Sequence, residues 1–182
     1  MSASDSDLLQ RCRAGDEAAW RELVARHTRR IFNLAYRFVG RVDEAEDLTQ
    51  DVFVGLLRQP DRFDPARGTL RAFLLGIARN LTLKHWRAEH RFEPLDDEEA
   101  VPAQSVDLER VDIGDAVGRA VRALRPLQRE VVILAEYEGL TLAEIARAVD
   151  ADVGTVKSRL HRARENLRRM LSPLRSRQPT TT

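Results

Sequence analysis

Apolar positions recur at steps of three and four residues along most of the chain, which is the period of one face of an α-helix. The longest such stretch lies between Asp16, a residue suited to cap a helix start, and Gly40, a residue suited to end one. Its apolar face is formed by Trp20, Leu23, Val24, His27, Ile31, Leu34, Ala35 and Phe38. The pattern predicts one long amphipathic helix, preceded by a short helix around Leu8.

Two further helices are predicted before the chain changes character. In the first, Asp43 can cap the start, Glu46 can reach back from three residues later, and Pro60 closes the helix. The second begins near Thr69 and runs to about Arg91. Together with the two preceding helices, they can bury one shared apolar core.

The composition shifts between residues 93 and 112, where eight acidic residues accompany a single base, Arg110, and two prolines. High charge with little periodicity is typical of a flexible linker. Helical spacing returns from about Gly114, and a further helix is predicted from Pro126 to Gly139. The chain is therefore predicted to be all-α, with two small helical domains, residues 1–91 and 114–173, a flexible acidic linker, residues 92–113, and a disordered tail, residues 174–182.

The last two predicted helices have the arrangement of a helix-turn-helix. Thr141 and Glu144 fit a capping box at the start of the first helix, the run DADVG forms the turn, and Asp152 can cap the second helix. On a helical wheel, one narrow arc of the second helix must face the core. This arc contains Val156, Leu160, Ala163, Leu167 and Met170. The opposite arc contains Ser158, Arg162, Glu165 and Arg169.

That polar arc suits the major groove of DNA. Arg can bind guanine through two hydrogen bonds, Ser and Thr can reach base edges or phosphates, and a helix N-terminus favours phosphate oxygens. A basic helical face is also common where a helix simply faces solvent. The capped helix and turn that precede this one favour DNA binding.

Overall composition leaves the class of partner open. The 30 Lys and Arg nearly balance the 29 Asp and Glu, so only the distribution of charge can indicate a polyanion partner. Cys12 is the only cysteine, which excludes an internal disulfide framework, and neither it nor the four histidines show metal-ligand spacing. No apolar run has the length of a signal peptide core or a membrane span. We predict a cytoplasmic protein with no cofactor and no metal.

Three segments resemble the extracytoplasmic-function sigma factors of bacterial RNA polymerase. The run EIARAVDADVGTVKSRLHRARENLRR, residues 144–169, is similar to the family's promoter-binding C-terminal domain. The run DEAEDLTQDVFVGLLR, residues 43–58, resembles the helix that binds core polymerase. The run LRAFLLGIARNLTLKHWRAEHR, residues 70–91, resembles the segment that melts and reads the minus-ten element. The resemblance implies a factor that directs promoter-specific initiation and is held inactive by an anti-sigma factor.

The resemblance also implies partners and site residues. Core polymerase is expected to bind through the clamp coiled coil of its largest subunit and the flap of its second. The residues expected at the polymerase are Glu46, Asp47, Leu48, Gln50, Asp51 and Phe53. Those expected at minus-ten DNA are Asn80, Lys84, Arg87 and Arg91. Those expected at minus-thirty-five DNA are Thr155, Lys157, Ser158, Arg159, His161, Arg162 and Arg164.

Two positions depart from the family pattern. Phe73 stands where the family commonly has tryptophan, and Lys84 stands where it commonly has aspartate. Phe73 lies on the apolar face, so that change is mild. Lys84 places positive charge beside the expected DNA stripe, which bears on promoter preference.

Two other classes of function compete with this interpretation. A helix-turn-helix regulator could bind an operator without joining polymerase, but it has no need of the acidic helix at residues 43–58. An enzyme would need clustered, inward-pointing carboxylates near a phosphate-binding or nucleophile motif, and the sequence has no such motif. No catalytic activity is predicted.

Overall fold

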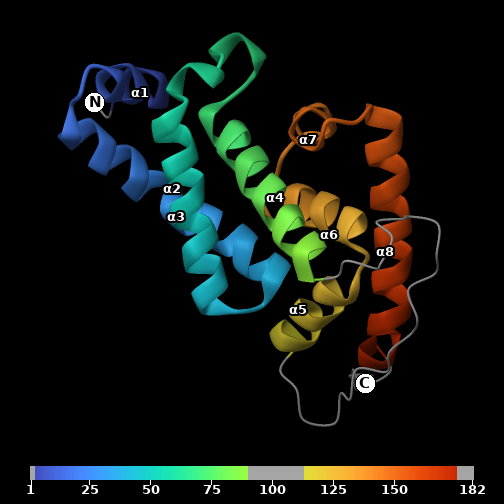
Figure 1. The fold of residues 1–182 in the computed structure, drawn as a ribbon. Coiled ribbons are helices and arrows are strands. Elements are labelled where there is room, and N and C mark those ends of the chain that lie inside the picture. Colours follow the sequence, from blue (N-terminus) through green and yellow to red (C-terminus); the bar gives the residue numbers. More distant parts are fainter. Residues whose placement is uncertain (1–2, 90–112, 176–182) are drawn as a thin grey trace, which may run out of the picture.

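The computed structural model describes residues 3–89 and 113–175, and within these ranges the chain forms helices and turns without a strand (Figure 1). The first half contains α1 (Asp5–Arg13), α2 (Glu17–Val39), α3 (Val42–Arg58), the short 3₁₀ turns η1 (Pro60–Arg62) and η2 (Pro65–Arg67), and α4 (Leu70–Glu89). The second half contains α5 (Ile113–Ala123), α6 (Pro126–Val132), the π-helical turn η3 (Ile133–Tyr137), α7 (Leu142–Val149) and α8 (Val153–Arg175). The all-α prediction is confirmed.

Several predicted segments lie outside the described residues. They are most of the acidic linker, the predicted minus-ten residue Arg91, and the tail beyond residue 175. The helix α8 runs through Pro173, so the chain is still helical at the first two residues of the predicted tail. Among the described residues, no helix is long and apolar enough to cross a membrane.

The boundaries of α2 form for the reasons that the sequence predicts. The Asp16 carboxylate accepts hydrogen bonds from the backbone N–H groups of Ala18 and Ala19 at 2.9 and 3.0 Å. These bonds satisfy two of the donors that a helix start leaves without an intrahelical partner. At the other end, Gly40 adopts φ 84°, a left-handed conformation that glycine reaches without strain.

The predicted cap at Asp43 is wrong. The helix α3 begins at Val42, and the N-cap position is taken by Arg41, whose side chain makes no capping bond. Asp43 lies instead in the first turn, where its carboxylate accepts a hydrogen bond from Arg41 Nη2 at 2.9 Å. That bond lowers the pKa of Asp43 below its ordinary value. Asp43 therefore contributes charge at the positive end of the helix rather than a cap.

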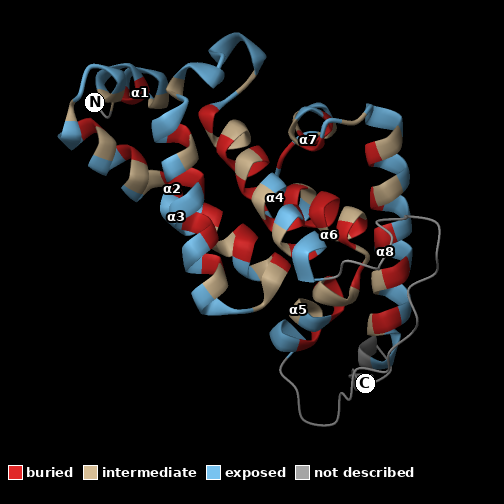
Figure 2. Cartoon of the chain, in the orientation of Figure 1, coloured by how far each residue is buried: buried red, intermediate tan, exposed pale blue. Residues whose placement is uncertain are grey.

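The helices α2, α3 and α4 pack against one another and form the core of the first half. Their buried faces are aliphatic, and Figure 2 shows the buried positions on the sides of the helices that face neighbouring helices. Trp86, near the end of α4, is buried in this core. Its role is therefore packing, and its ring does not present a face to solvent on which a base could stack.

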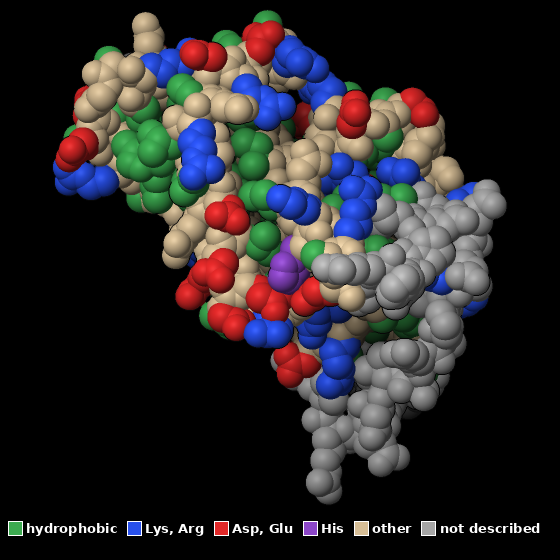
Figure 3. All heavy atoms as spheres, in the orientation of Figure 1, with side chains coloured by type: hydrophobic (Ala, Val, Ile, Leu, Met, Phe, Trp, Pro, Cys, Tyr) green, Lys and Arg blue, Asp and Glu red, His purple; other side chains and the backbone are tan. Residues whose placement is uncertain are grey.

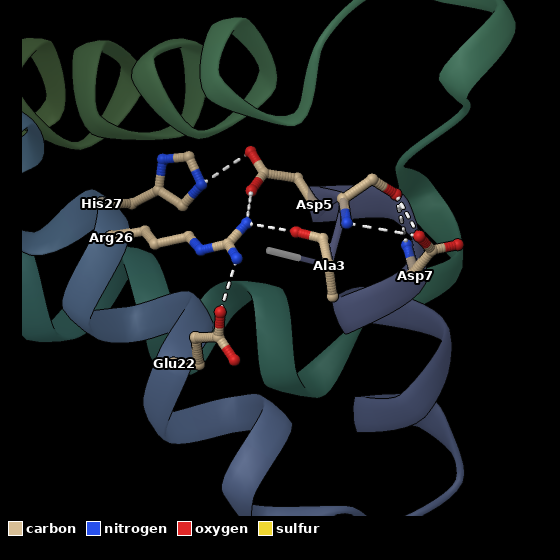
Figure 4. Close-up of polar contacts among 7 residues, drawn as sticks. Ala3, Asp5, Asp7, Glu22, Arg26 and His27 are labelled. Carbon is tan, nitrogen blue, oxygen red and sulfur yellow. Dashed lines mark hydrogen bonds and ion pairs between the residues drawn. The ribbon is translucent and has the colours of Figure 1, made fainter. Parts of the chain in front are cut away.

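The short helix α1 is attached to α2 by a group of polar contacts (Figure 4). Arg26 on α2 donates to the carbonyl oxygen of Ala3 at 2.7 Å and to the Asp5 carboxylate at 3.1 Å. The other Asp5 oxygen lies 2.9 Å from His27 Nε2, and His27 is buried. The Leu8 and Leu9 side chains of α1 are also buried. Polar contacts and buried apolar side chains thus hold α1 against α2.

The two halves pack against each other and share one apolar cluster. In Figure 1, α4 lies beside α6 and α7, and both contacts are close in the structure. Gly76 on α4 lies so near α7 that an added Cβ would be 3.6 Å from the backbone of Ala148. The sequence predicted two domains but not this packing, because it joins segments on opposite sides of the predicted linker.

Candidate nucleic-acid interface

The helices α7 and α8 form the predicted helix-turn-helix. Thr141 N–H donates to Glu144 Oε2 at 2.8 Å, and Glu144 N–H donates to Thr141 Oγ1 at 3.2 Å, so the capping box is confirmed. Asp150 ends α7 in the left-handed conformation with φ 52°. The Asp152 carboxylate then accepts from Thr155 N–H at 2.8 Å at the start of α8. These bonds fix the turn and therefore the direction in which α8 leaves it.

The outward face of α8 carries four of the predicted DNA residues. The exposed side chains are those of Lys157, Ser158, His161 and Arg162. Thr155 is only half-exposed, and its hydroxyl donates to Asp152 Oδ2 at 2.6 Å, so it belongs to the helix cap. The opposite face is buried through Val156, Leu160, Ala163 and Met170. A short polar and basic stretch at the beginning of a fixed helix has the form that enters the major groove.

The other two predicted residues of α8 contact protein in this structure. Arg159 keeps 16% of its side-chain surface exposed, and its Nη1 lies 3.6 Å from Glu130 Oε1 on α6. Glu130 also pairs with Arg79 of α4, so Arg159 lies near a contact between the two halves of the molecule. Arg164 is exposed and pairs with Glu136 at 2.6 Å. Both side chains thus have an acidic partner on another element of the second half.

The predicted minus-ten residues form a stripe on α4. Asn80, Lys84 and Arg87 are all exposed, and their spacing of four and three residues places them on one side of the helix. The Asn80 side-chain oxygen accepts a hydrogen bond from Arg79 Nη1 at 2.8 Å. Such a line of basic and amide groups is suited to follow a phosphate backbone.

A cavity of about 440 Å³ adjoins this stripe. It is formed by the end of α3, the two 3₁₀ turns, the first half of α4 and part of α7. The side chains that give it chemical character are Arg58, Arg62, Arg67, Phe63, Phe73 and Asn80. Phe63 and Phe73 lie with their ring centroids 5.6 Å apart. The sequence reasoning missed this cavity, although Phe73 was singled out there as a departure from the family.

The exposed face of α3 contains most of the predicted polymerase residues. Glu46, Asp47, Gln50 and Asp51 are exposed. Leu48 and Phe53 are buried, and Phe53 packs edge-on against Trp20 with ring centroids 6.2 Å apart. These two side chains therefore support the helix from within and do not face a partner.

Two apolar residues that the sequence reasoning missed continue the same face of α3. Val54 and Leu57 are exposed, and Leu57 keeps 60% of its surface open to solvent. They follow Gln50 and Asp51 at helical spacing, so an acidic stripe passes into an apolar one. The sequence did contain a sign of this surface, because Val54 and Leu57 are apolar residues that do not lie on the core-facing side of the helix. Adjacent exposed apolar residues are typical of a protein-binding surface.

Both halves of the chain match family models. Residues 23–92 match the model of sigma-70 region 2, and residues 114–167 match the model of sigma-70 region 4. The chain is also 31% identical to the ECF RNA polymerase sigma factor SigW of Bacillus subtilis, over 91% of this chain and 96% of that protein. The chain belongs to the extracytoplasmic-function sigma factors of the sigma-70 family. The predicted family is confirmed, and sigma factors are initiation factors without enzymatic activity.

Other relatives of this sigma factor support the assignment. It is 38% identical to SigE of Mycolicibacterium smegmatis over 87% of its own length, and it spans 65% of the length of that relative. A solved structure of the sigma factor RpoE with the anti-sigma factor NepR from Bartonella quintana is 26% identical, with a TM-score of 0.66 over 84% of this chain and 96% of that one. A structure of CnrH with the cytosolic domain of CnrY is 27% identical, with a TM-score of 0.69 over 97% and 100% of the two chains.

Proposed function

We propose that this sigma factor binds core RNA polymerase through the exposed face of α3 and directs initiation at specific promoters. The observation that carries the proposal is the exposed stripe on α3, in which Asp47, Gln50 and Asp51 lead to Val54 and Leu57. Acidic residues are repelled by DNA and attracted to a basic protein surface. The adjacent Leu57 adds apolar area that a partner can bury. The clamp coiled coil of the largest polymerase subunit is the partner that the family implies, with the flap of the second subunit as a further contact.

DNA contacts are assigned to two other surfaces. The outward face of α8, with Lys157, Ser158, His161 and Arg162, reads the minus-thirty-five element in the major groove. The stripe of Asn80, Lys84 and Arg87 on α4 follows the strand near the minus-ten element. The adjacent cavity combines arginines with two phenylalanine rings, which suits a base that has left the duplex.

These two DNA surfaces require the halves of the molecule to move apart. The promoter elements are separated by well over one helical turn, whereas α7 lies against α4 in this structure. An extended chain covers roughly 3.3 Å per residue, so the segment between the halves is long enough to allow the movement. We assign residues 1–91 and 114–173 to the two moving units and residues 92–113 to a flexible connection.

An anti-sigma factor is the second proposed partner. Two similar solved structures are of the sigma factor RpoE with the anti-sigma factor NepR and of CnrH with the cytosolic domain of CnrY. A partner of this kind would hold this sigma factor inactive in the cytoplasm, where polymerase and promoter DNA are found.

Pull-down by core polymerase tests the α3 assignment. We expect Asp47→Arg to reduce binding to core by about tenfold or more, because it reverses the charge at the centre of the acidic stripe. Glu17→Arg, at an exposed position in the first turn of α2, is the matched control and should bind as wild type does. Equal binding by the two variants, both folded by circular dichroism, would exclude α3 as the polymerase surface.

A further inference from the structure

The geometry points to a binding site for a divalent first-row transition-metal ion, of the Zn²⁺ type, between the start of α3 and the end of α4. Glu44 on α3 and His85 and Glu89 on α4 each offer one ligand atom, and these atoms all lie within 4.8 Å of one another. His85 Nε2 is 3.0 Å from Glu44 Oε2 and 3.5 Å from Glu89 Oε1. An ion placed among the three atoms would need only small rotations of exposed or half-exposed side chains.

Two helices bring these residues together for reasons of spacing. His85 and Glu89 are four residues apart, so they lie one above the other on the same face of α4. Glu44 belongs to the first turn of α3, which packs against α4. The sequence reasoning found no metal-ligand spacing because the third ligand lies 41 residues before His85. In Figure 3, acidic side chains gather on the surface over the start of α3 and the end of α4.

The surroundings of Glu44 resemble those of a metal ligand. Its Oε1 forms an ion pair with Arg41, whose Nε lies 2.8 Å away, whereas its Oε2 lies 3.0 Å from His85 Nε2. Carboxylates that bind metals commonly have a second polar partner, which helps to fix the direction of the ligating oxygen, and Arg41 is such a partner for Glu44. Arg41 also pairs with Asp43, which is not one of the three proposed ligands. The positive charge of Arg41 is therefore partly neutralised by this second carboxylate.

The chemistry of the three ligands selects the class of ion. One imidazole with two carboxylates suits Zn²⁺, Co²⁺ or Ni²⁺, whereas Mg²⁺ and Ca²⁺ prefer sites made of oxygen alone. Three protein ligands leave at least one position for water. A bound ion would connect α3, which carries the proposed polymerase surface, to α4, which carries the proposed minus-ten stripe. It would therefore stabilise the relation between these two surfaces.

Calorimetric titration of the metal-free full-length chain with Zn²⁺ tests the site, and Co²⁺ absorption reports the ligands. We expect one ion per chain, a rise in Tm with Zn²⁺, and an affinity that falls as the pH is lowered because protons compete for the imidazole. His85→Ala and Glu44→Gln should each weaken binding by about tenfold or more, as loss of a ligand does. Mg²⁺ at the same concentration should leave Tm unchanged.

The controls separate this site from metal held elsewhere. His161→Ala removes a histidine on α8 and should leave Zn²⁺ affinity and the Tm rise as in wild type. His90→Ala tests the nearest other histidine in the sequence and should also bind Zn²⁺ as wild type does. The proposal is overturned by the absence of saturable binding, by binding that survives both His85→Ala and Glu44→Gln, by binding lost only in His90→Ala, or by Mg²⁺ binding as strong as that of Zn²⁺.

Discussion

Arg162 and Arg159 lie three residues apart on α8 and have opposite surroundings. Arg162 is exposed on the outward face with Lys157, Ser158 and His161. Arg159 keeps only 16% of its side-chain surface exposed and lies near the buried Glu130 of α6. Two arginines of one helix thus differ in exposure, and DNA binding is proposed for the exposed one. The comparison shows that the position on the helical wheel decides how exposed each arginine is.

Glu130, Arg79 and Arg159 form an inward group of charged side chains, with Glu130 at its centre. The Glu130 side chain is 1% exposed and accepts two hydrogen bonds from Arg79 on α4, at 2.5 Å from Nε and 3.0 Å from Nη2. The adjacent residue, Arg129, is half-buried, and the loss of solvent around its guanidinium lowers its pKa to about 10. Arg129 Nη1 donates to the carbonyl oxygen of Phe38, near the end of α2, at 2.6 Å. Neighbouring residues of α6 therefore bind two helices of the first half.

The largest effect is expected when Glu130 is removed. Glu130→Ala leaves Arg79 and Arg159 facing each other without a carboxylate, so we expect the free energy of unfolding to fall by about 3 to 5 kcal/mol. Urea denaturation measures the change. Glu165→Ala is the matched control, because it removes an exposed carboxylate that pairs only at the surface with Arg168, and it should cost less than about 1 kcal/mol. Equal losses in the two variants would contradict the distinction between inward and outward charges.

The Glu130 contacts also show where sequence reasoning stops. Helix boundaries at Asp16, Thr141 and Asp152 were predictable because capping depends on residues within four positions of each other. The Arg79–Glu130 pair joins residues 51 positions apart, and no local periodicity reports such a contact. Nor could the turns between α3 and α4 be placed, so the cavity that they help to form was missed.

In the candidate site, too, the sequence predicted what depends on helical period but not what depends on contacts between distant elements. The wheel correctly predicted that Ser158 and Arg162 are exposed opposite the buried arc of α8, since this follows from the period of the helix alone. It did not predict the partner of Arg159. This residue lies at the margin of the buried arc, where contacts depend on the neighbouring helix α6. The roles of these residues at DNA remain predictions.

A second prediction concerns strand opening. The Asn80→Ala, Arg87→Ala double variant removes two exposed members of the α4 stripe, and it also removes the hydrogen bond that Asn80 accepts from Arg79. We expect about tenfold less permanganate reactivity of the melted region at limiting holoenzyme, because backbone and base contacts are lost. Arg119→Ala on α5 is a control outside the stripe. Unchanged reactivity in the double variant would remove the stripe from the DNA surface.

A third prediction is that Arg164 contributes to DNA affinity but not to the recognition of particular bases. Arg164 is exposed and pairs with Glu136, and we expect it to contact a phosphate rather than a base at DNA. Arg164→Ala should weaken holoenzyme binding by a similar factor on every promoter sequence and reduce the salt slope by about one. Binding measured on several duplexes at three salt concentrations gives both quantities. A loss confined to one base pair would instead make Arg164 a reader of sequence.

The smallest predicted effect is on the pH dependence of stability, and it compares a buried histidine, His27, with an exposed one, His161. Burial lowers the pKa of His27 below its ordinary value of 6.5, although the Asp5 carboxylate acts in the opposite direction. The unfolded chain therefore takes up this proton first as the pH falls, so the free energy of unfolding should decrease below about pH 6.5. His27→Gln should flatten this part of the pH profile, whereas the exposed His161→Gln should retain it. Identical slopes in wild type and His27→Gln would contradict the assignment.

The most direct test of the division between outward and inward arginines is the affinity of holoenzyme containing Arg162→Ala for cognate and altered minus-thirty-five elements. The outward placement of Arg162 predicts a loss of about 1 to 3 kcal/mol on the cognate element and a flattened preference at one base pair. An equal loss on cognate and scrambled elements would contradict base reading by this face of α8.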